Sequence, residues 1–343
     1  MKYKLTEFSH GAGCGCKLSP GVLRDILAVH QKPSAFSQLL VGNDTKDDAA
    51  VVDLDGETAI VSTTDFFMPI VDDAYDFGAI AATNAISDIY AMGAEPIMAI
   101  AILGWPIDKI PTEVAAEVML GGNEVCEKAG IPLAGGHSID APEPIFGLAV
   151  TGKVPVTRIK KNKDGQVGDL LYLTKPLGIG MITTAQKRKL ADEADLTMAK
   201  ASMLTLNQIG QALGTQSYVH AITDVTGFGL GGHLLEVCEA GRTSATIYAE
   251  DIPLFEFVEK YMELDCIPGG TNRNWESYGA QIALSNDAYY KILADPQTSG
   301  GLLISVDPVR QRDFESFISD RGYDLKPIGR LEKADSKKMI KVI

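Results

Sequence analysis

The stretch Asp76–Met92, which reads DFGAIAATNAISDIYAM, decides the fold because it is apolar around nearly its whole circumference. A helix of this kind lies inside a protein rather than on its surface. Gly93 follows it directly and Pro96 comes soon after, which is typical of the end of a helix. The sequence therefore predicts a buried helix over 76–92, with Asn84 and Asp88 four residues apart on one of its faces.

Strand patterns surround this helix in the first half of the chain. Two short apolar runs, 49–52 and 59–61, flank the turn signal Asp55-Gly56 and predict a β-hairpin whose second strand ends at Asp65. Further patterns predict a strand at 96–103, a helix at 113–129 and a strand at 145–151. We therefore expect the first half to form an α/β domain.

The second half of the chain shows the same alternation. Its patterns predict strands at 170–174, 243–249 and 301–306, and helices at about 196–213, 229–240 and 308–321. A polar, lysine-rich segment, 158–165, lies between the halves and is interpreted as a solvated linker. Residues 1–20 are polar and glycine-rich, and are interpreted as a flexible catalytic arm. The expected parts are the arm 1–20, an N-terminal domain 21–157 and a C-terminal α/β domain 165–343.

Length and composition narrow the class of protein. A chain of 343 residues is longer than one hydrophobic core usually serves, which favours two domains. The net charge of −14 argues against nucleic acid as a partner, because binding to nucleic acid depends on clustered cations. The sequence has no run of 18 apolar residues and no signal-peptide pattern, so we expect no membrane contact and a cytoplasmic location. Five cysteines, an odd number, indicate reduced thiols.

The N-terminal segment 10–17, HGAGCGCK, carries two cysteines beside a lysine. Its three glycines let the backbone approach a ligand closely, and Lys17 should favour thiolate over thiol and lower the pKa of a cysteine toward neutrality. A nucleophile is one interpretation, and a Cys-x-Cys metal site or a plain flexible tail are two others that these residues leave open. The segment is not a phosphate-binding P-loop, because Cys16 and Leu18 stand where that motif has glycine and Ser/Thr.

Aspartates mark the ends of several predicted elements. Asp44, Asp47 and Asp48 precede the first strand of the hairpin, Asp65 ends its second strand, and Asp88 lies on the apolar helix. A carboxylate in so apolar a helix is costly unless it is paired or bound to a metal. Magnesium ions that also hold phosphates require hard oxygen ligands of this kind. A turn or helix cap remains open for Asp44 and Asp47, and a hydrogen-bonded core role remains open for Asp88.

Two glycine-bearing segments, 133–138 and 174–180, are interpreted as turns after strands that could present N–H groups to phosphates. A third, 227–232, matches the dinucleotide-binding pattern G-x-G-x-x-G. The strand expected before it is interrupted by Thr223 and Asp224, where a dinucleotide site would continue apolar into the turn. We therefore disfavour nicotinamide binding and interpret Asp224 as a candidate metal ligand.

Six segments together resemble the selenophosphate synthetases, in order and across essentially the whole chain. They are HGAGCGCK (10–17), TTDFF (63–67), ATNAISD (82–88), GGHSID (135–140), TDVTGFG (223–229) and DPQTSGG (295–301). Several are similar to the wider aminoimidazole ribonucleotide synthetase superfamily, whose members use ATP to phosphorylate oxygen or nitrogen groups. The arm with Cys14 and Lys17 separates the selenium enzymes from those relatives.

The resemblance implies a fold and an assembly. The fold is the two-domain aminoimidazole ribonucleotide synthetase-like α/β fold, of the α+β type, in a homodimer whose N-terminal sheets pair across the interface. It also implies site residues. These are Cys14 and Lys17 as catalytic residues, Lys17, Thr45, Lys46, Asp47, Asp65 and Asp88 at ATP, Asp48, Asp65, Asp88 and Asp224 at Mg²⁺ and the phosphates, and Gly136, His137 and Ser138 reaching ATP from the partner subunit.

The activity that the resemblance implies is the conversion of ATP, selenide and water to selenophosphate, AMP and orthophosphate. Mg²⁺ is the expected cofactor, and a selenium-delivery protein is an expected partner besides the second subunit. Lys46 stands where many relatives have arginine, so it keeps a cation at this position but lacks the bidentate guanidinium fork. The alternatives are a kinase or synthetase of the same superfamily that acts on another small substrate, a nicotinamide oxidoreductase, and a non-enzymatic carrier that uses Cys14, Cys16 and His10.

Overall fold

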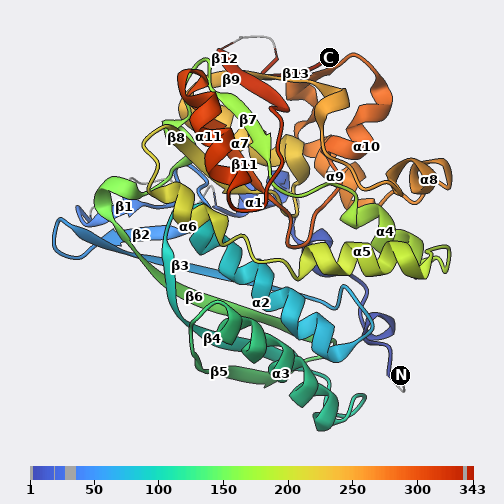
Figure 1. The fold of residues 1–343 in the computed structure, drawn as a ribbon. Coiled ribbons are helices and arrows are strands. Elements are labelled where there is room, and N and C mark those ends of the chain that lie inside the picture. The colour runs from blue at the N-terminus through green and yellow to red at the C-terminus, as the bar shows by residue number, and fades with distance from the viewer. Residues whose placement is uncertain (1–2, 19, 28–35, 335–337) are drawn as a thin grey trace.

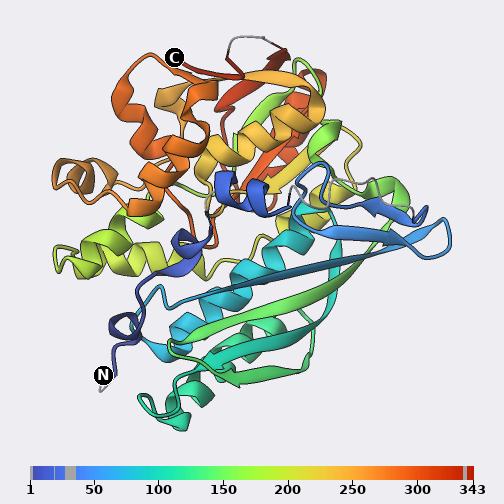
Figure 2. The same cartoon turned by 180° about the vertical axis from the view of Figure 1, so that it is seen from behind.

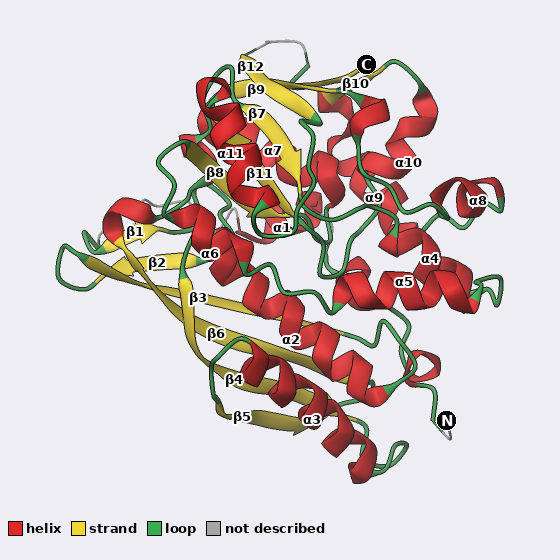
Figure 3. Cartoon of the chain, in the orientation of Figure 1, coloured by secondary structure: helices red, strands yellow, loops and turns green. Residues whose placement is uncertain are grey.

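The computed structural model describes residues 3–18, 20–27, 36–334 and 338–343 of the chain. Two β-sheets, one in each half of these residues, form the framework, with helices packed against them (Figures 1 and 3). The N-terminal sheet has the order β1-β2-β3-β6-β4-β5. Its strands are β1 (Leu39–Val41), β2 (Ala50–Asp53), β3 (Thr58–Phe67), β4 (Glu95–Trp105), β5 (Leu133–Asp140) and β6 (Ile145–Pro155).

The predicted buried helix is α2 (Ala74–Ala91), so its ends agree with the prediction to within two residues. Nearly all of its side chains are buried, because it packs on β3 and β6 on one side and contacts α6 and β8 of the other half as well. Asp73 caps its first turn by accepting a hydrogen bond from the Asp76 N–H. Helix α3 (Thr112–Lys128) lies beside α2 on the same face of the sheet (Figure 1).

Glycine sets the distance between α2 and α3. A Cβ added at Gly121 would lie 2.0 Å from the Tyr75 carbonyl oxygen, and one at Gly78 would lie 1.8 Å from that of Val118. A side chain at either position would therefore push the helices apart.

The predicted hairpin is confirmed, because β2 and β3 pair antiparallel with Asp53 opposite Ala59. The expected end of its second strand at Asp65 is wrong, since β3 continues pairing with β6 as far as Phe67 opposite Phe146. The predicted turn at 133–138 is also wrong. That segment belongs to β5, an edge strand parallel to β4, and Gly136 allows it to approach, because a Cβ there would lie 2.2 Å from the Ala101 carbonyl oxygen.

The C-terminal sheet has the order β10-β13-β9-β12-β7-β11-β8 among the described residues. Its strands are β7 (Leu170–Leu173), β8 (Val219–Asp224), β9 (Thr243–Ile247), β10 (Ile282–Leu284), β11 (Leu302–Val306), β12 (Gly329–Lys333) and β13 (Ile340–Val342). Its helices are α4 (Ile179–Lys187), α5 (Glu193–Met203), α6 (Ile209–Gly214), α7 (Gly229–Gly241), α8 (Val258–Glu263), α9 (Gly269–Tyr278), α10 (Tyr290–Leu293) and α11 (Gln311–Ser319).

Helices α7 and α11 cover opposite faces of this sheet (Figures 1 and 2). Phe314 of α11 packs on Tyr172 of β7 with 4.6 Å between ring centroids, while Leu234 of α7 belongs to the core that includes Leu171. The single helix predicted at 196–213 is two helices, α5 and α6, with a break around Thr205. None of the described helices combines the length and hydropathy that a membrane crossing requires.

The lysine-rich segment between the halves is solvated only in part, at Arg158, Lys163 and Asp164. Lys160 is buried and donates hydrogen bonds from Nζ to the carbonyl oxygens of Gln216 and Val219, at 2.9 and 2.6 Å. Burial lowers the pKa of Lys160 to about 8. Asn162 is fully buried and donates from Nδ2 to the Lys46 carbonyl oxygen at 2.9 Å. Through Lys160 and Asn162 the segment forms a packed seam between the two halves.

The N-terminal segment crosses from one half to the other. Figure 2 shows it rising along the N-terminal half to α1 (Pro20–Leu27), which lies against the C-terminal half. Its short 3-10 helix η2 (Gly13–Cys16) contacts β3 of the first half and α9 of the second. The segment thus brings its cysteines to the junction of the halves.

Candidate active site

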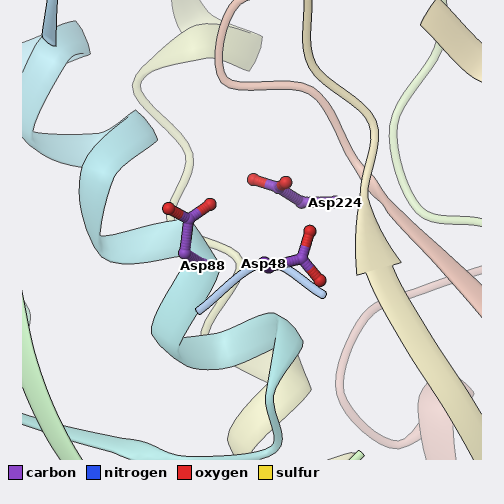
Figure 4. Close-up of side chains that lie close together, drawn as sticks. All are labelled: Asp48, Asp88 and Asp224. Carbon is purple, nitrogen blue, oxygen red and sulfur yellow. The ribbon is translucent and has the colours of Figure 1, made fainter. Parts of the chain in front are cut away.

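Three carboxylates converge at the junction of the halves and form an aspartate cluster, Asp48, Asp88 and Asp224 (Figure 4). Asp48 precedes β2, Asp88 lies on α2, and Asp224 ends β8. One oxygen from each lies within 4.8 Å of the others. The two halves of the chain therefore both supply this cluster.

The aspartate cluster is electrostatically unfavourable when nothing neutralises it. Burial raises the pKa of all three carboxyl groups, and repulsion from Asp224 raises those of Asp48 and Asp88 further. Thr223 donates to Asp48 at 2.8 Å, and Thr63 donates to Asp88. Within the described residues, one oxygen of Asp48 and one of Asp224 have no hydrogen-bond partner although they are buried. Such free, hard oxygen ligands fit a divalent cation such as Mg²⁺.

Asp65 anchors a second group of polar side chains beside the cluster. The distance from Lys17 Nζ to Asp65 Oδ2 is 2.9 Å, and Asn84 Nδ2 donates a hydrogen bond to the same oxygen at 2.6 Å. Burial alone would lower the pKa of Lys17, but Asp65, Cys14 and Asp88 outweigh burial and raise it well above its usual value. An ammonium group is thus held permanently beside the carboxylates.

Cys14 is joined to this group through Asn84. Its thiol donates to Asn84 Oδ1 at 3.3 Å, and its backbone N–H donates to Thr298 Oγ1 at 3.0 Å. The expected lowering of its pKa by Lys17 is overturned, because burial raises the pKa of Cys14 well above its ordinary value and outweighs the effect of Lys17. Only 1% of Cys14 is exposed, so in this arrangement it is a protonated, enclosed thiol.

Cys16 lies in a different environment. Its sulfur contacts the Gly13 carbonyl oxygen at 2.9 Å, and burial raises its pKa as well. Among the described residues, the aspartate cluster is the group found with the spacing of metal ligands, and neither cysteine belongs to such a group. The structure therefore does not support a Cys-x-Cys metal site.

A cavity of about 850 Å³ opens onto these groups. Its lining includes Lys17, Asp65 and the aspartate cluster, together with Asp44, Lys46 and Asp47 from the loop before β2. Asp47 accepts a hydrogen bond from the Asn162 N–H at 2.6 Å, which ties this loop to the seam. Thr45 is not part of the described lining, and its hydroxyl donates to Asp47 instead.

Three predicted site residues lie elsewhere. Gly136, His137 and Ser138 are exposed on the edge strand β5 and are not part of the described lining of this cavity. The resemblance assigned them to the ATP of a neighbouring subunit, and that role stays a prediction.

Two glycine-bearing segments have different roles from those considered. In 174–180, the N–H groups of Gly178 and Ile179 donate to Gln297 Oε1, and that of Gly180 donates to Asp295, so α4 does not offer them to a phosphate. The strand before 227–232 does run through Asp224, contrary to expectation. It is nevertheless an edge strand antiparallel to β11, whereas a dinucleotide site needs parallel strands.

Sequence reasoning gave no site role to Asn84. Asn84 links Cys14 to Asp65, and it also accepts the Ser299 N–H at 2.7 Å. Its spacing of four residues from Asp88, on an apolar helix, was the available signal, because a polar pair on such a face points to one site. Thr63 and Thr223, which hold the aspartates, gave no signal beyond lying beside them.

Comparisons with known proteins identify the family. The family models "AIR synthase related protein, N-terminal domain" and "AIR synthase related protein, C-terminal domain" match residues 46–154 and 166–342. Selenide, water dikinase of Aeromonas salmonicida is 55% identical over 341 residues, covering 99% of each chain. That of Sulfurovum sp. is 56% identical over 326 residues, covering 95% of each. The chain belongs to the selenide, water dikinase family. The sequence-based identification of the family is confirmed.

Solved structures show how far the fold of this selenide, water dikinase family member is shared. Thiamine-monophosphate kinase from Stenotrophomonas maltophilia superimposes with a TM-score of 0.66 at 18% identity, covering 95% of this chain and 96% of the other. AaThiL in complex with AMPPCP and TMP gives a TM-score of 0.67 at 18% identity, covering 94% and 92%. The predicted two-domain α/β fold is confirmed by this likeness and by the two family models.

Proposed function

We propose that the chain makes selenophosphate from ATP, selenide and water, releasing AMP and orthophosphate, in the cavity at the junction of its halves. The observation that carries this proposal is the joining of Cys14 and Lys17 to the carboxylates through Asn84 and Asp65, in a chain more than half identical to selenide, water dikinases. A sulfur, an ammonium group and metal-ligating oxygens in one place are what transfer of a phosphoryl group to selenium requires.

Mg²⁺ is the proposed cofactor, held by Asp48, Asp88 and Asp224. The free carboxylate oxygens and the raised pKa values of these groups support a cation here, because a divalent charge would stabilise all three as carboxylates. When bound, the ion would neutralise phosphate charge. Lys17, held by Asp65, adds a second positive charge for the phosphoryl group in transfer.

Nucleotide contacts are proposed for the loop before β2 and the groups beside it. Lys46 and Asp47 line the cavity, and Thr45 supports Asp47 through its hydroxyl. The proposed nucleotide contacts also include Asp65, Asp88 and Lys17. Lys46 is held by an ion pair with Glu239 at 2.7 Å, so a nucleotide would have to compete with Glu239 for it.

A homodimer is proposed because the N-terminal sheet has an exposed apolar face. Phe66, Met98 and Ile100 are 39–47% exposed on the face opposite α2 and α3. An apolar face of this kind is typical of a subunit interface. Pairing of two such sheets would place Gly136, His137 and Ser138 of one copy near the ATP of the other.

Cys14 is the proposed selenium-handling residue. Because it is enclosed, selenium would have to reach it when the N-terminal segment is displaced, and a selenium-delivery protein is a proposed partner for that step. We propose a cytoplasmic location, where the reduced state of all five cysteines would persist.

The test is phosphorus NMR of ATP incubated anaerobically with the protein, Mg²⁺ and selenide. The expected products are AMP, orthophosphate and a selenium-coupled phosphorus signal, all dependent on selenide. Formation of ADP alone with another acceptor would instead favour a kinase of the same superfamily, and absence of any turnover would reject the proposal.

A further inference from the structure

Three further side chains line the same cavity and have no role in the site described so far. Thr226 follows β8, and His233 and Glu236 lie on α7. His233 Nε2 lies 3.3 Å from Thr226 Oγ1, and its Nδ1 lies 3.1 Å from Glu236 Oε2. A hydroxyl, an imidazole and a carboxylate therefore follow one another at contact distance.

This order of groups fixes how the imidazole can act. A carboxylate beside Nδ1 favours a proton on that nitrogen, so Nε2 is left as the acceptor for the Thr226 hydroxyl. The Glu236 oxygen is close to Nδ1 but is not aligned for a hydrogen bond, and within the described residues that buried nitrogen has no hydrogen-bond partner. The contact is thus electrostatic, and it would strengthen when His233 gains a proton.

The surroundings of His233 keep it in this position. Only 6% of the residue is exposed, and its ring stacks on Phe228 with 5.7 Å between centroids. Phe228 is held in turn by Tyr278 of α9, whose hydroxyl donates to the Phe228 carbonyl oxygen at 2.6 Å. The charged group that faces His233 from β8 is Asp224.

We propose that Thr226, His233 and Glu236 form the proton acceptor for the water that cleaves the second phosphoanhydride of ATP. This rests on the proposed function, in which selenide takes the terminal phosphoryl group and leaves ADP. The water oxygen bonds to the β-phosphorus of ADP, and the oxygen that bridges the α- and β-phosphorus atoms leaves with AMP. One water proton passes to the Thr226 hydroxyl as the hydroxyl proton passes to His233 Nε2, and orthophosphate is the other product.

The two nucleophiles of the reaction, hydrogen selenide and water, differ in chemistry, and this difference explains why only the water step would need a proton acceptor. Hydrogen selenide is already largely an anion at neutral pH and is a soft, strong nucleophile. Water is neutral and weak, and it gains from a base positioned to take its proton. Cys14 and Lys17 contact Asn84 and Asp65, whereas His233 contacts Thr226 and Glu236, so the two steps use separate side chains.

The experiment measures selenophosphate, ADP and AMP formed per ATP by phosphorus NMR, for Thr226→Val, His233→Asn and Glu236→Gln. AMP should fall about 100-fold or more in the first two variants, while ADP accumulates in a 1:1 ratio to selenophosphate, because general-base catalysis is worth about 10²–10⁴-fold. Thr226→Ser, which restores the hydroxyl, should restore AMP. The matched control is His220→Asn, because His220 contacts Asp169 at 2.9 Å and is not part of the described cavity lining.

The outcomes separate the two proposals. A wild-type protein that forms no selenophosphate rejects the proposed function whatever the variants do. Suppose that the wild type forms selenophosphate. The proton acceptor is then rejected if Thr226→Val and His233→Asn lose AMP and selenophosphate in parallel, or if both variants keep the wild-type ratio of AMP to selenophosphate. Should His233→Asn fail to fold, cleavage of added ADP by folded Thr226→Val decides the question, since hydrolysis at the wild-type rate overturns the inference.

Discussion

Cys14 and Cys16 are two residues apart, yet the structure gives them different partners. Cys14 contacts Asn84 inside the site, whereas Cys16 contacts the backbone of its own 3-10 helix. Cys14→Ser should abolish selenide-dependent AMP formation, because a hydroxyl offers neither a soft anion nor a comparable nucleophile. Cys16→Ser should retain most activity and serves as the control. Nucleotide binding, measured by calorimetry, should persist in both, and an active Cys14→Ser protein would remove Cys14 from the chemistry.

Asp88 allows a test of the metal site that does not depend on activity. Folding raises the pKa of Asp88 well above 3.8, its value in the unfolded chain. The protonated carboxyl group therefore contributes stability that is fully present below pH 3.8, and this stability is lost as the pH rises through the pKa of the folded state. Without Mg²⁺ at pH 7, Asp88→Asn should therefore unfold at a higher temperature than the wild type, by about 2–4 °C for each kcal/mol of repulsion removed. The difference should shrink as the pH falls toward 3.8.

Added Mg²⁺ should reverse this order, because the wild type has the complete set of carboxylates and gains more from binding than the variant does. Thermal unfolding with EDTA and with Mg²⁺, followed by circular dichroism, measures both effects. Equal gains from Mg²⁺ in the two proteins would exclude Asp88 as a ligand.

Among the elements, α2 and α3 depend on the small size of Gly121. Gly121→Ala would place a Cβ 2.0 Å from the Tyr75 carbonyl oxygen, and we expect a loss of about 1–3 kcal/mol in the free energy of unfolding from overpacking. Leu120→Ala is the control on the same helix, because Leu120 is 52% exposed. Denaturant unfolding measures both. A Gly121→Ala protein as stable as the control would show that the helices can separate without cost.

Sequence patterns predicted well those elements whose pattern is complete within a short window of sequence. Helix α2 is apolar all round and the hairpin has a turn signal, so both followed from short windows of sequence. Strand β5 was missed because the pair Gly135-Gly136 is typical of a turn. The close approach of β4 requires glycine at Gly136, whereas at Gly135 the backbone φ of +125° favours glycine and no neighbour would touch a Cβ. The contacts of Asp48 with Thr223, and of Cys14 with Thr298, join residues far apart in the chain, so no local pattern could reveal them.

At the scale of the whole molecule, the exposed face of the N-terminal sheet predicts the oligomeric state. Phe66→Asp on that face should convert a dimer into a monomer, because a charge would be buried without a partner in the interface. Val309→Asp is the control, since Val309 is 85% exposed in the C-terminal half. Light scattering measures the mass. A wild-type monomer that is fully active at high dilution would contradict the proposed dimer.

The aspartate cluster draws Asp48 and Asp88 from one half of the chain and Asp224 from the other, and Thr223 of the second half donates to Asp48 of the first. An ion bound there would act as a removable cross-link between two folding units. Its binding energy would count toward their docking, so cation concentration would set whether the halves melt together or in sequence. Tight metal binding would then also make the unfolding of the two halves cooperative. A mutation of Lys160 or Asn162 in the seam would weaken the docking of the halves, and thereby the affinity for the metal, without touching the metal site.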